Sequence, residues 1–429
     1  MIKLQKYYFT LALLFTFLSA VAQSTTNSPY SKFGLGTIKG AYLAQNKGMG
    51  NLAFGISSYG GYQNINVANP ASYSNIRLTT FDIGARAEIQ NLTKGSVSEK
   101  GFNGSLSHFV FAIPVTKKSA LSFGLLPYSN LGYNFTNASM VDTFSVEHIY
   151  RGEGGLAKAY LGYGIKLGKH FSVGANVTYL FGNLKQSTST EFSKYVGFLN
   201  SRKQIENSVG GIVAEYGLQY VTALNKKTKL TIGYAGNLKS NLQTTNKILY
   251  TRYQKNISTD RELASDTTKF QNNISGKMVL PSSNNFGFSI ERVNHWLIGA
   301  DLRTTRWSEL VRNDVNQNLN NSWGVSVGGQ ITPDINAVSN YLALIDYRVG
   351  FNFDKTFMHV SQTDIKSSSL NVGLGLPLLS ARTTFYKINI ATEIGKRGTT
   401  DNNLVKEKFI NIHIGFTIND RWFQKYKFD

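Results

Sequence analysis

The sequence contains no cysteine, which excludes disulfides, thiolate metal sites and cysteine nucleophiles. After residue 22 it has no run of eighteen or more apolar residues, the length that a membrane-spanning helix requires. Proline is also scarce, with 7 in 429 residues, whereas Gly (40), Phe (27) and Tyr (23) are abundant. This composition favours many strands and turns over packed helices.

The N-terminus has the three parts of an export signal. Lys3 and Lys6 precede the apolar run YYFTLALLFTFL, and the small residues Ala20-Val21-Ala22 follow it. We therefore predict a signal peptide at residues 1–22 and a mature chain that begins at Gln23. The alternative, a membrane anchor, is disfavoured because the run is short for a spanning helix.

The net charge of +20 makes the chain strongly basic. In an exported protein these lysines and arginines are expected to face anionic outer-membrane lipid and lipopolysaccharide, or to keep loops soluble. No basic helix or recognised binding motif accompanies the charge, so we expect no nucleic-acid partner.

Apolar and polar residues alternate from residue 78 onward. In YLALIDYRVGFNF, the apolar residues from Tyr341 to Phe353 share one face, and Asp346, Arg348 and Asn352 lie on the other. Long strands with one continuous apolar face, after an export signal, predict an all-β fold: a transmembrane antiparallel β-barrel, apolar outward and polar inward. About fourteen segments fit: 78–90, 104–115, 119–136, 155–168, 171–186, 204–223, 228–238, 284–293, 295–306, 322–331, 340–353, 367–377, 384–396 and 407–418.

The connections between these segments alternate in length, as in outer-membrane barrels with short periplasmic turns and longer external loops. The longer loops are predicted at 91–103, 137–154, 187–203, 239–283, 307–321, 354–366 and 397–406. The barrel is expected to span residues 78–429 and to end in a periplasmic tail. Residues 23–77 are too short and weakly patterned for a separate domain, and we predict that they plug the lumen; a disordered leader is the alternative.

Several stretches along the chain match motifs of one family in the same order. VANPAS, with Asn69-Pro70-Ala71, is similar to the signature of that family's N-terminal hatch, and FGFSIERVNHWLIGADLRTTRW is similar to its late hairpin. NSPYSKFGLG, VGLGLPL and the ending FTINDRWFQKYKFD resemble a Bacteroidota branch of unassigned members. On these residues the chain resembles the long-chain fatty-acid channels of the outer membrane (FadL-like), a family that includes aromatic-hydrocarbon channels.

The resemblance implies a fourteen-strand barrel closed by the hatch, in which hydrophobic substrates leave sideways at a kinked third strand. The third predicted strand contains SFGLLPYSNLGYNF (122–135), and its Pro127 lacks the N–H that a sheet ladder needs. Lipid offers no substitute for a missing wall hydrogen bond, so we predict a bend or gap here, with a proline tolerated near the rim as the alternative. The lateral-gate candidates are Leu126, Pro127, Tyr128 and Asn130.

The same resemblance implies passive uptake of small hydrophobic molecules, of fatty-acid or aromatic type, by a monomeric barrel. One feature departs from the family: the predicted loop at 239–283 is mostly polar, whereas the loops that collect ligands are apolar. The alternative is therefore a barrel that transports nothing and serves, with envelope protein partners, as a subunit of a secretion or outer-membrane protein assembly complex.

Charged residues on the inward faces form the other candidate site. We expect them to pair across the lumen and hold the plug, because barrel lumens are polar by default; contact with a substrate is the alternative. They are Asp82, Arg86, Glu88, Glu215, Asp301, Arg303, Asp346, Arg348, Lys387 and Glu393.

No catalytic or cofactor site is predicted. GVSVG (324–328) fits the G-x-S-x-G pattern, but Ser326 lies within a predicted strand rather than at a strand-to-helix turn. The six histidines are scattered without metal-binding spacing, so we expect neither a metal site nor an enzyme.

Overall fold

The computed structural model describes residues 28–59, 63–192, 195, 197–256, 259, 261–378 and 384–422. The predicted signal peptide and the last seven residues of the aromatic tail lie outside this part of the chain. Within it, no helix has both the length and the hydropathy needed to cross a membrane.

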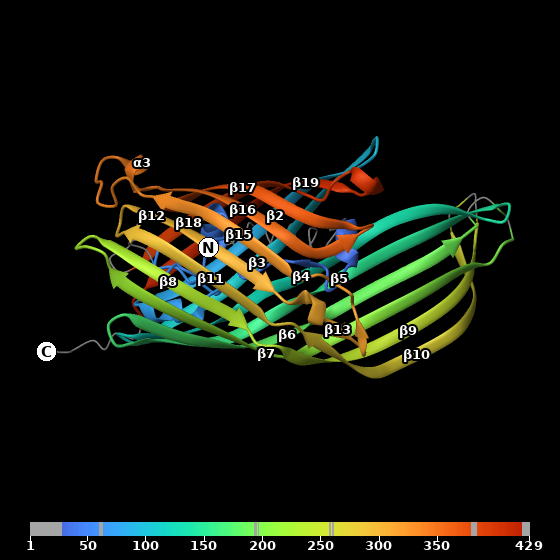
Figure 1. The fold of residues 1–429 in the computed structure, drawn as a ribbon, viewed down its shortest axis with the longest axis horizontal. Coiled ribbons are helices and arrows are strands. Elements are labelled where there is room, and N and C mark those ends of the chain that lie inside the picture. Colours follow the sequence, from blue (N-terminus) through green and yellow to red (C-terminus); the bar gives the residue numbers. More distant parts are fainter. Residues whose placement is uncertain are drawn as a thin grey trace, which may run out of the picture.

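Among the described residues, fourteen antiparallel strands form a closed barrel, as predicted (Figure 1). Strand β19 pairs with β2 from Lys406/Thr93 to Asp420/Thr79 and closes the wall. In order around the wall the strands are β2 (Thr79–Lys94), β3 (Val97–Thr116), β4 (Ser119–Val141), β5 (Phe144–Leu167), β6 (Phe171–Glu191), β7 (Asn200–Ala223), β8 (Thr228–Asn237), β11 (Ser283–Arg292), β12 (Trp296–Thr305), β15 (Ser322–Ile331), β16 (Asp346–Val360), β17 (Thr363–Pro377), β18 (Phe385–Arg397) and β19 (Lys406–Asp420).

The wall is apolar outside and polar inside. On β16, Tyr347, Val349 and Phe351 are exposed on the outer surface, whereas Asp346 and Arg348 are buried. The same alternation appears on β17 and β4, as expected for a barrel that spans a membrane. Alternate residues of each strand therefore point inward, so the position of a residue along its strand determines whether its side chain faces the lumen.

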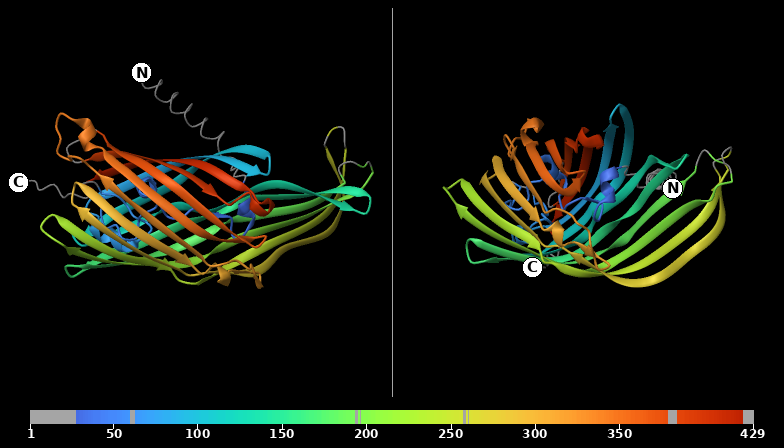
Figure 2. Two further views of the ribbon diagram at one scale, coloured as in Figure 1. Left: turned by 45° about the horizontal axis from the view of Figure 1, so that its top comes forward. Right: turned by 45° about the vertical axis from the view of Figure 1, so that its right-hand side comes forward.

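One part of the wall extends far beyond the rest (Figure 2). After β8 the chain forms a hairpin of β9 (Ser240–Lys255) and β10 (Glu262–Leu280), and β9 pairs with the outer half of β7. The predicted loop at 239–283 is therefore wrong, because these residues are mostly strand. Both faces of β10 are exposed over much of its length, and the buried face of β9 carries polar residues such as Thr244 and Asn246. Hydrophobicity therefore does not alternate along the hairpin, and the strand signal disappears from the sequence.

The outer halves of several other strands were likewise predicted as loops. The segments 91–103, 137–154 and 354–366 are mostly strand. Within each segment a turn of two residues, such as Asp142-Thr143, joins one strand to the next. Positive φ angles at Gly95, Asp142 and Gln362 allow these tight turns. The predicted strand 340–353 is also too long: Asn340 caps α3 (Tyr341–Leu344) by accepting from the Leu342 N–H at 3.1 Å, and the strand begins at Asp346.

The described residues of the N-terminal segment, 28–59 and 63–77, pack within the barrel, where Leu35, Met49 and Ile65 are completely buried (Figure 1). Its elements are η1 (Pro29–Lys32), β1 (Thr37–Ile38), α2 (Ala44–Gly48) and η2 (Pro70–Asn75). The connection from β12 to β15 carries η3 (Trp307–Glu309), β13 (Val311–Arg312) and β14 (Val315–Asn316), and η4 (Asp401–Asn403) precedes β19. Segment 28–77 is called the plug below.

Candidate functional site

The Asn69-Pro70-Ala71 motif lies against the inner wall of the barrel. Asn69 caps η2: its side chain accepts from the Ala71 N–H at 3.1 Å and donates to the Phe54 carbonyl at 2.8 Å. Asn69 and Ala71 are fully buried, so the motif is more than a surface Asn-Pro turn.

A row of three glycines on adjacent strands makes room for this motif. Gly164, Gly174 and Gly217 are in register across β5, β6 and β7. A Cβ atom added at Gly174 would lie 2.4 Å from the Pro70 carbonyl carbon, and one at Gly217 would lie 2.2 Å from the Asn69 Oδ1. This row was not predicted, although glycine at inward positions of three successive strands is a signal that could have revealed it.

Adding one methyl group to this row is expected to destabilise the seated plug. We expect Gly174→Ala to lower the free energy of unfolding by about 1–3 kcal/mol, because the new Cβ collides with backbone that cannot rotate away. Denaturant unfolding in detergent would measure the change. Gly101→Ala is the matched control, because its Cβ meets only the flexible Gln90 side chain, at 3.3 Å. Equal effects of the two substitutions would contradict a tight fit at η2.

Wall residues also bind the plug backbone directly. The Asp301 carboxylate of β12 accepts from the Ala53 N–H at 2.6 Å and the Phe54 N–H at 3.0 Å. On the neighbouring strand, Ser289 donates to the Gly55 carbonyl at 2.6 Å. These contacts fix residues 53–55 to one side of the wall.

The ion pairs of the predicted lumen charges form separate clusters, and most clusters include partners that were not predicted. Within the predicted set, Asp346 pairs with both Arg348 and Lys387, and Arg86 pairs with Glu88. The clusters are Asp82 with His108, Arg86 and Glu88 with Lys39, Glu215 with Lys158, Arg303 with Asp354, Asp346 with Arg348 and Lys387, and Glu393 with Lys47 and His413.

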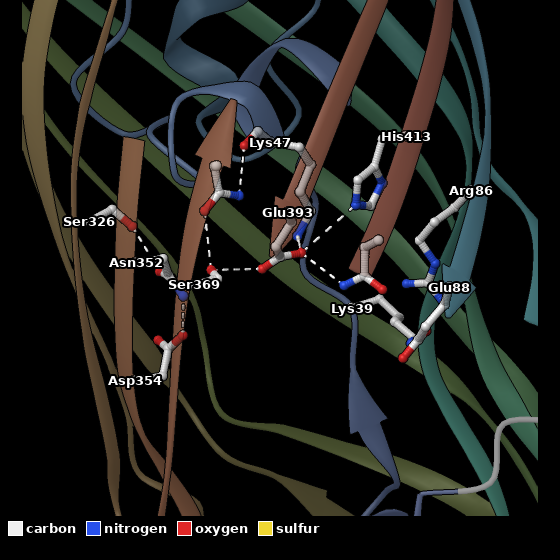
Figure 3. A network of polar contacts seen from close by, with 12 residues as sticks. Lys39, Lys47, Arg86, Glu88, Ser326, Asn352, Asp354, Ser369, Glu393 and His413 are labelled. Carbon is white, nitrogen blue, oxygen red and sulfur yellow. Dashed lines mark hydrogen bonds and ion pairs between the residues drawn. The ribbon is translucent and has the colours of Figure 1, made fainter. Parts of the chain in front are cut away.

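Two clusters join the plug to the wall (Figure 3). Lys39 Nζ lies 3.5 Å from Glu88 of β2, and Lys47 Nζ lies 3.9 Å from Glu393 of β18. Burial lowers the pKa of Lys39 to about 7, an effect that Glu88 opposes, and burial likewise lowers the pKa of Lys47. The plug has no periodic pattern, so no sequence signal indicates that these two lysines face the wall carboxylates.

The ladder between β3 and β4 stops halfway along the wall. It runs from Thr116/Ser119 only to Phe109/Leu125, and the β4–β5 register then shifts between Pro127 and Ser129. Beyond this point β3 follows β2 and β4 follows β5, and the two hairpins separate (Figure 2). We call this opening, between Val97–His108 and Leu126–Val141, the β3–β4 seam.

The plug covers the inner end of the seam. Strand β1 pairs antiparallel with β4, placing Thr37 opposite Asn130 and Ile38 opposite Ser129, and the Lys39 N–H donates to the Tyr128 carbonyl at 3.0 Å. Of the predicted gate residues, Leu126 is buried in an apolar cluster, Asn130 faces β1, and Pro127 and Tyr128 line a cavity. A role for these four residues in a gate stays a prediction.

That cavity has a volume of about 390 Å³ and lies between plug residues 36–42 and the wall. The lining is mixed: Trp307 and Phe357 belong to its apolar part, and many charged groups contribute as well. They include Lys39, Arg86, Glu88, Lys158, Glu215 and Glu393.

The remaining sequence motifs show no catalytic arrangement. Ser326 lies in the middle of β15, as predicted, and its hydroxyl is bound by Arg303 at 2.6 Å and contacts Asn352 at 2.9 Å. In the described part of the chain, no three His, Cys, Asp or Glu side chains gather as metal ligands would.

The fold is similar to those of a solved FadL homologue and of solved hydrocarbon channels, which confirms the predicted resemblance at the level of fold. A FadL homologue of Pseudomonas aeruginosa has a TM-score of 0.57 and 12% identity, covering 90% of this chain and 100% of that one. The Ralstonia pickettii toluene transporter TbuX has a TM-score of 0.56, with 11% identity and coverage of 89% and 99%. The CymD monoaromatic hydrocarbon channel has a TM-score of 0.53, with 13% identity and coverage of 91% and 99%.

A search of curated proteins gave no match. The whole sequence, residues 1–429, matches one protein family, whose description is BamG. Since the match includes the plug and every strand of the barrel, the chain belongs to the BamG family.

Proposed function

We propose that this chain is a sealed, outer-membrane barrel subunit of an outer-membrane protein assembly complex, exported by its signal peptide. The many charged groups in the lining of the cavity described above carry the proposal. An apolar ligand there would exclude the remaining water from ion pairs such as Lys158 with Glu215 without offering hydrogen bonds in its place, which is costly. The family name BamG supports the same reading, because it points to an assembly complex.

Two further features suit a subunit better than a pore. The plug is bonded to several strands of the wall, among them β12 through Asp301 and β18 through Glu393, so its displacement would break several buried contacts together. The sheet of β4 to β7, β9 and β10 projects beyond the rest of the wall (Figure 1) and offers surface to another protein. Both features favour a scaffold that presents surface and keeps its lumen closed.

The β3–β4 seam favours a second candidate, uptake of small hydrophobic molecules with lateral exit near Pro127. The ladder ends at Leu125, next to that proline, and Pro127 and Tyr128 reach the cavity. Strand β1 and Tyr128 would have to move before a ligand could pass, because Lys39 is bonded to the Tyr128 carbonyl.

Purification from native membranes in mild detergent tests the two candidates. For a complex subunit we expect envelope proteins to co-purify in a fixed ratio, no apolar ligand to be found by native mass spectrometry, and no increase in dye uptake by proteoliposomes. Recovery of the barrel alone, with an exchangeable apolar ligand bound, would refute the subunit proposal and support transport.

A further inference from the structure

The outer half of β4 is a regular strand edge that lies open. From Ser129 to Val141 the pairing with β5 continues to Phe144 without a register shift. On the other side, among the described residues, only plug groups up to Gly132 contact this edge, through β1 and the Ser31 hydroxyl. From Thr136 to Val141 the residues on both faces of the strand are exposed, whereas a wall strand buries its inner face, so this stretch extends beyond the wall.

The opposite edge of the projecting sheet is irregular. Strand β10 has three register shifts against β9, between Ala264 and Asp266, Thr267 and Lys269, and Gln271 and Ile274. Asn273 also has a positive φ of 55°. Bulges of this kind disturb an edge and protect it from pairing with other chains. The β4 edge lacks that protection between Ser129 and Val141.

The chain itself shows that the β4 edge accepts a strand. Strand β1 pairs antiparallel with it at Asn130 and Ser129, and both backbone groups of Gly132 are bonded to the Ser31 hydroxyl, with donor–acceptor distances of 3.1 and 2.9 Å. Because residues along a strand alternate, the N–H and C=O of Asn134, Thr136 and Ala138 point to the same open side.

An aromatic cluster lies at the tip, directly after this edge. The Phe144 ring lies 5.1 Å from the rings of both Tyr195 and Phe198, and 6.5 Å from that of Phe192. Beside it, Met140 is 66% exposed and Val141 is 49% exposed. Exposed apolar groups gathered at the end of a polar projection are typical of a protein interaction site.

We propose that the β4 edge from Asn134 to Val141 accepts an antiparallel strand from a different envelope protein, and that an apolar side chain of this strand packs on the tip cluster around Phe144. The backbone of β4 supplies the hydrogen bonds and the cluster supplies selectivity, as in other cases of strand addition. This inference deepens the proposed function as a complex subunit and rests on it.

A second copy of this chain does not fit the site. Two copies inserted the same way in one membrane would both have β4 running outward, and could place these edges together only in parallel. The pairing that the structure shows on this edge is antiparallel. The occupant is therefore another protein.

Proline substitutions on the open side test the proposal. Thr136→Pro with Ala138→Pro removes two N–H donors that point away from β5, so the β4–β5 ladder is kept. Two lost backbone bonds correspond to about a tenfold loss of affinity. We expect about tenfold less of the partner to co-purify, whereas Thr136→Ala with Ala138→Ser, which keeps both donors, retains it. Unchanged thermal unfolding of both variants excludes misfolding, and retention of all partners by the proline variant would overturn the inference.

Site-specific photo-crosslinking identifies the occupant. A photoreactive residue at position 136 or 138 is expected to crosslink one envelope protein. Because the strands would be antiparallel, moving the probe from 136 to 138 should move the crosslinked residue toward the N-terminus of the partner strand. The same photoreactive residue at position 269, in place of Lys269 on the irregular edge, is expected to give no such crosslink. Adducts only with lipid, adducts between copies, or equal adducts from both edges would refute the inference. If the proline variant keeps its partners, the inference fails and the proposed function stands; if the unmodified barrel purifies alone, the proposed function itself fails.

Discussion

Replacing Asp346 by alanine is expected to lower the free energy of unfolding by about 3–5 kcal/mol. This carboxylate lies 2.7 Å from Arg348, also contacts Lys387, and accepts from the Thr332 hydroxyl at 2.7 Å. All three charged side chains are buried, so the substitution leaves two cations without their carboxylate in a place where water cannot replace it. Urea unfolding of the barrel in detergent would measure the loss. The folded fraction at each urea concentration is read from the electrophoretic mobility of unheated samples.

Glu153→Ala is the control for this prediction, because Glu153 pairs with Lys185 at 2.7 Å on the exposed projection. An exposed pair contributes about 0–1 kcal/mol, so this variant should unfold almost as the unmodified protein does. Adding Lys387→Met to Asp346→Ala is expected to recover part of the stability, because it removes one of the two uncompensated charges. A loss below about 1 kcal/mol for Asp346→Ala would show that water reaches the cluster and screens it.

The inward position of Asp346 could be predicted because a strand fixes the face of each residue. Asp346 and Arg348 are two residues apart in a strand, so both point inward whatever their neighbours are. Identifying Lys387 as a partner required the order of β16, β17 and β18 around the wall and the exact register between them. That register depends on turns whose lengths the sequence indicated only approximately.

Other features could not be predicted because the barrel strands were recognised by alternating apolar and polar residues. That alternation arises only where one face of a strand meets lipid and the other meets the polar lumen. Beyond the membrane a strand has no lipid-facing side, so β10 is polar on both faces, and β9 carries polar residues such as Thr244 and Asn246 even on its buried face. Both strands therefore resemble a polar loop in sequence. The plug is irregular for a different reason: it follows the inner wall through contacts such as Pro70 on Gly174, which no local pattern encodes. The ending of the β3–β4 ladder was foreseen only through Pro127 and the family resemblance, and its functional meaning stays a prediction.

Asp301→Ala is expected to loosen the plug and to make the barrel conduct ions. The substitution leaves the buried N–H groups of Ala53 and Phe54 without an acceptor, at a cost of about 1–3 kcal/mol each. Even 2 kcal/mol would raise the population of a displaced plug more than about tenfold. A fourteen-strand barrel without its plug is too wide for side chains to fill, so displacement should appear in planar lipid bilayers as channel openings that the unmodified protein rarely shows.

Asp301→Asn separates loss of the contact from loss of the charge. Its amide oxygen can still accept from one or both N–H groups, so we expect conductance between that of the unmodified protein and that of Asp301→Ala. Limited proteolysis adds a measurement that does not depend on ions, because residues 53–55 should become cleavable only when they leave the wall. If Asp301→Ala shows no channel openings and residues 53–55 stay resistant to proteolysis, η2 and the two lysine contacts hold the plug without this carboxylate. The seal would then depend on the fit at the glycine row more than on charge, and Gly174→Ala would become the variant expected to open the barrel.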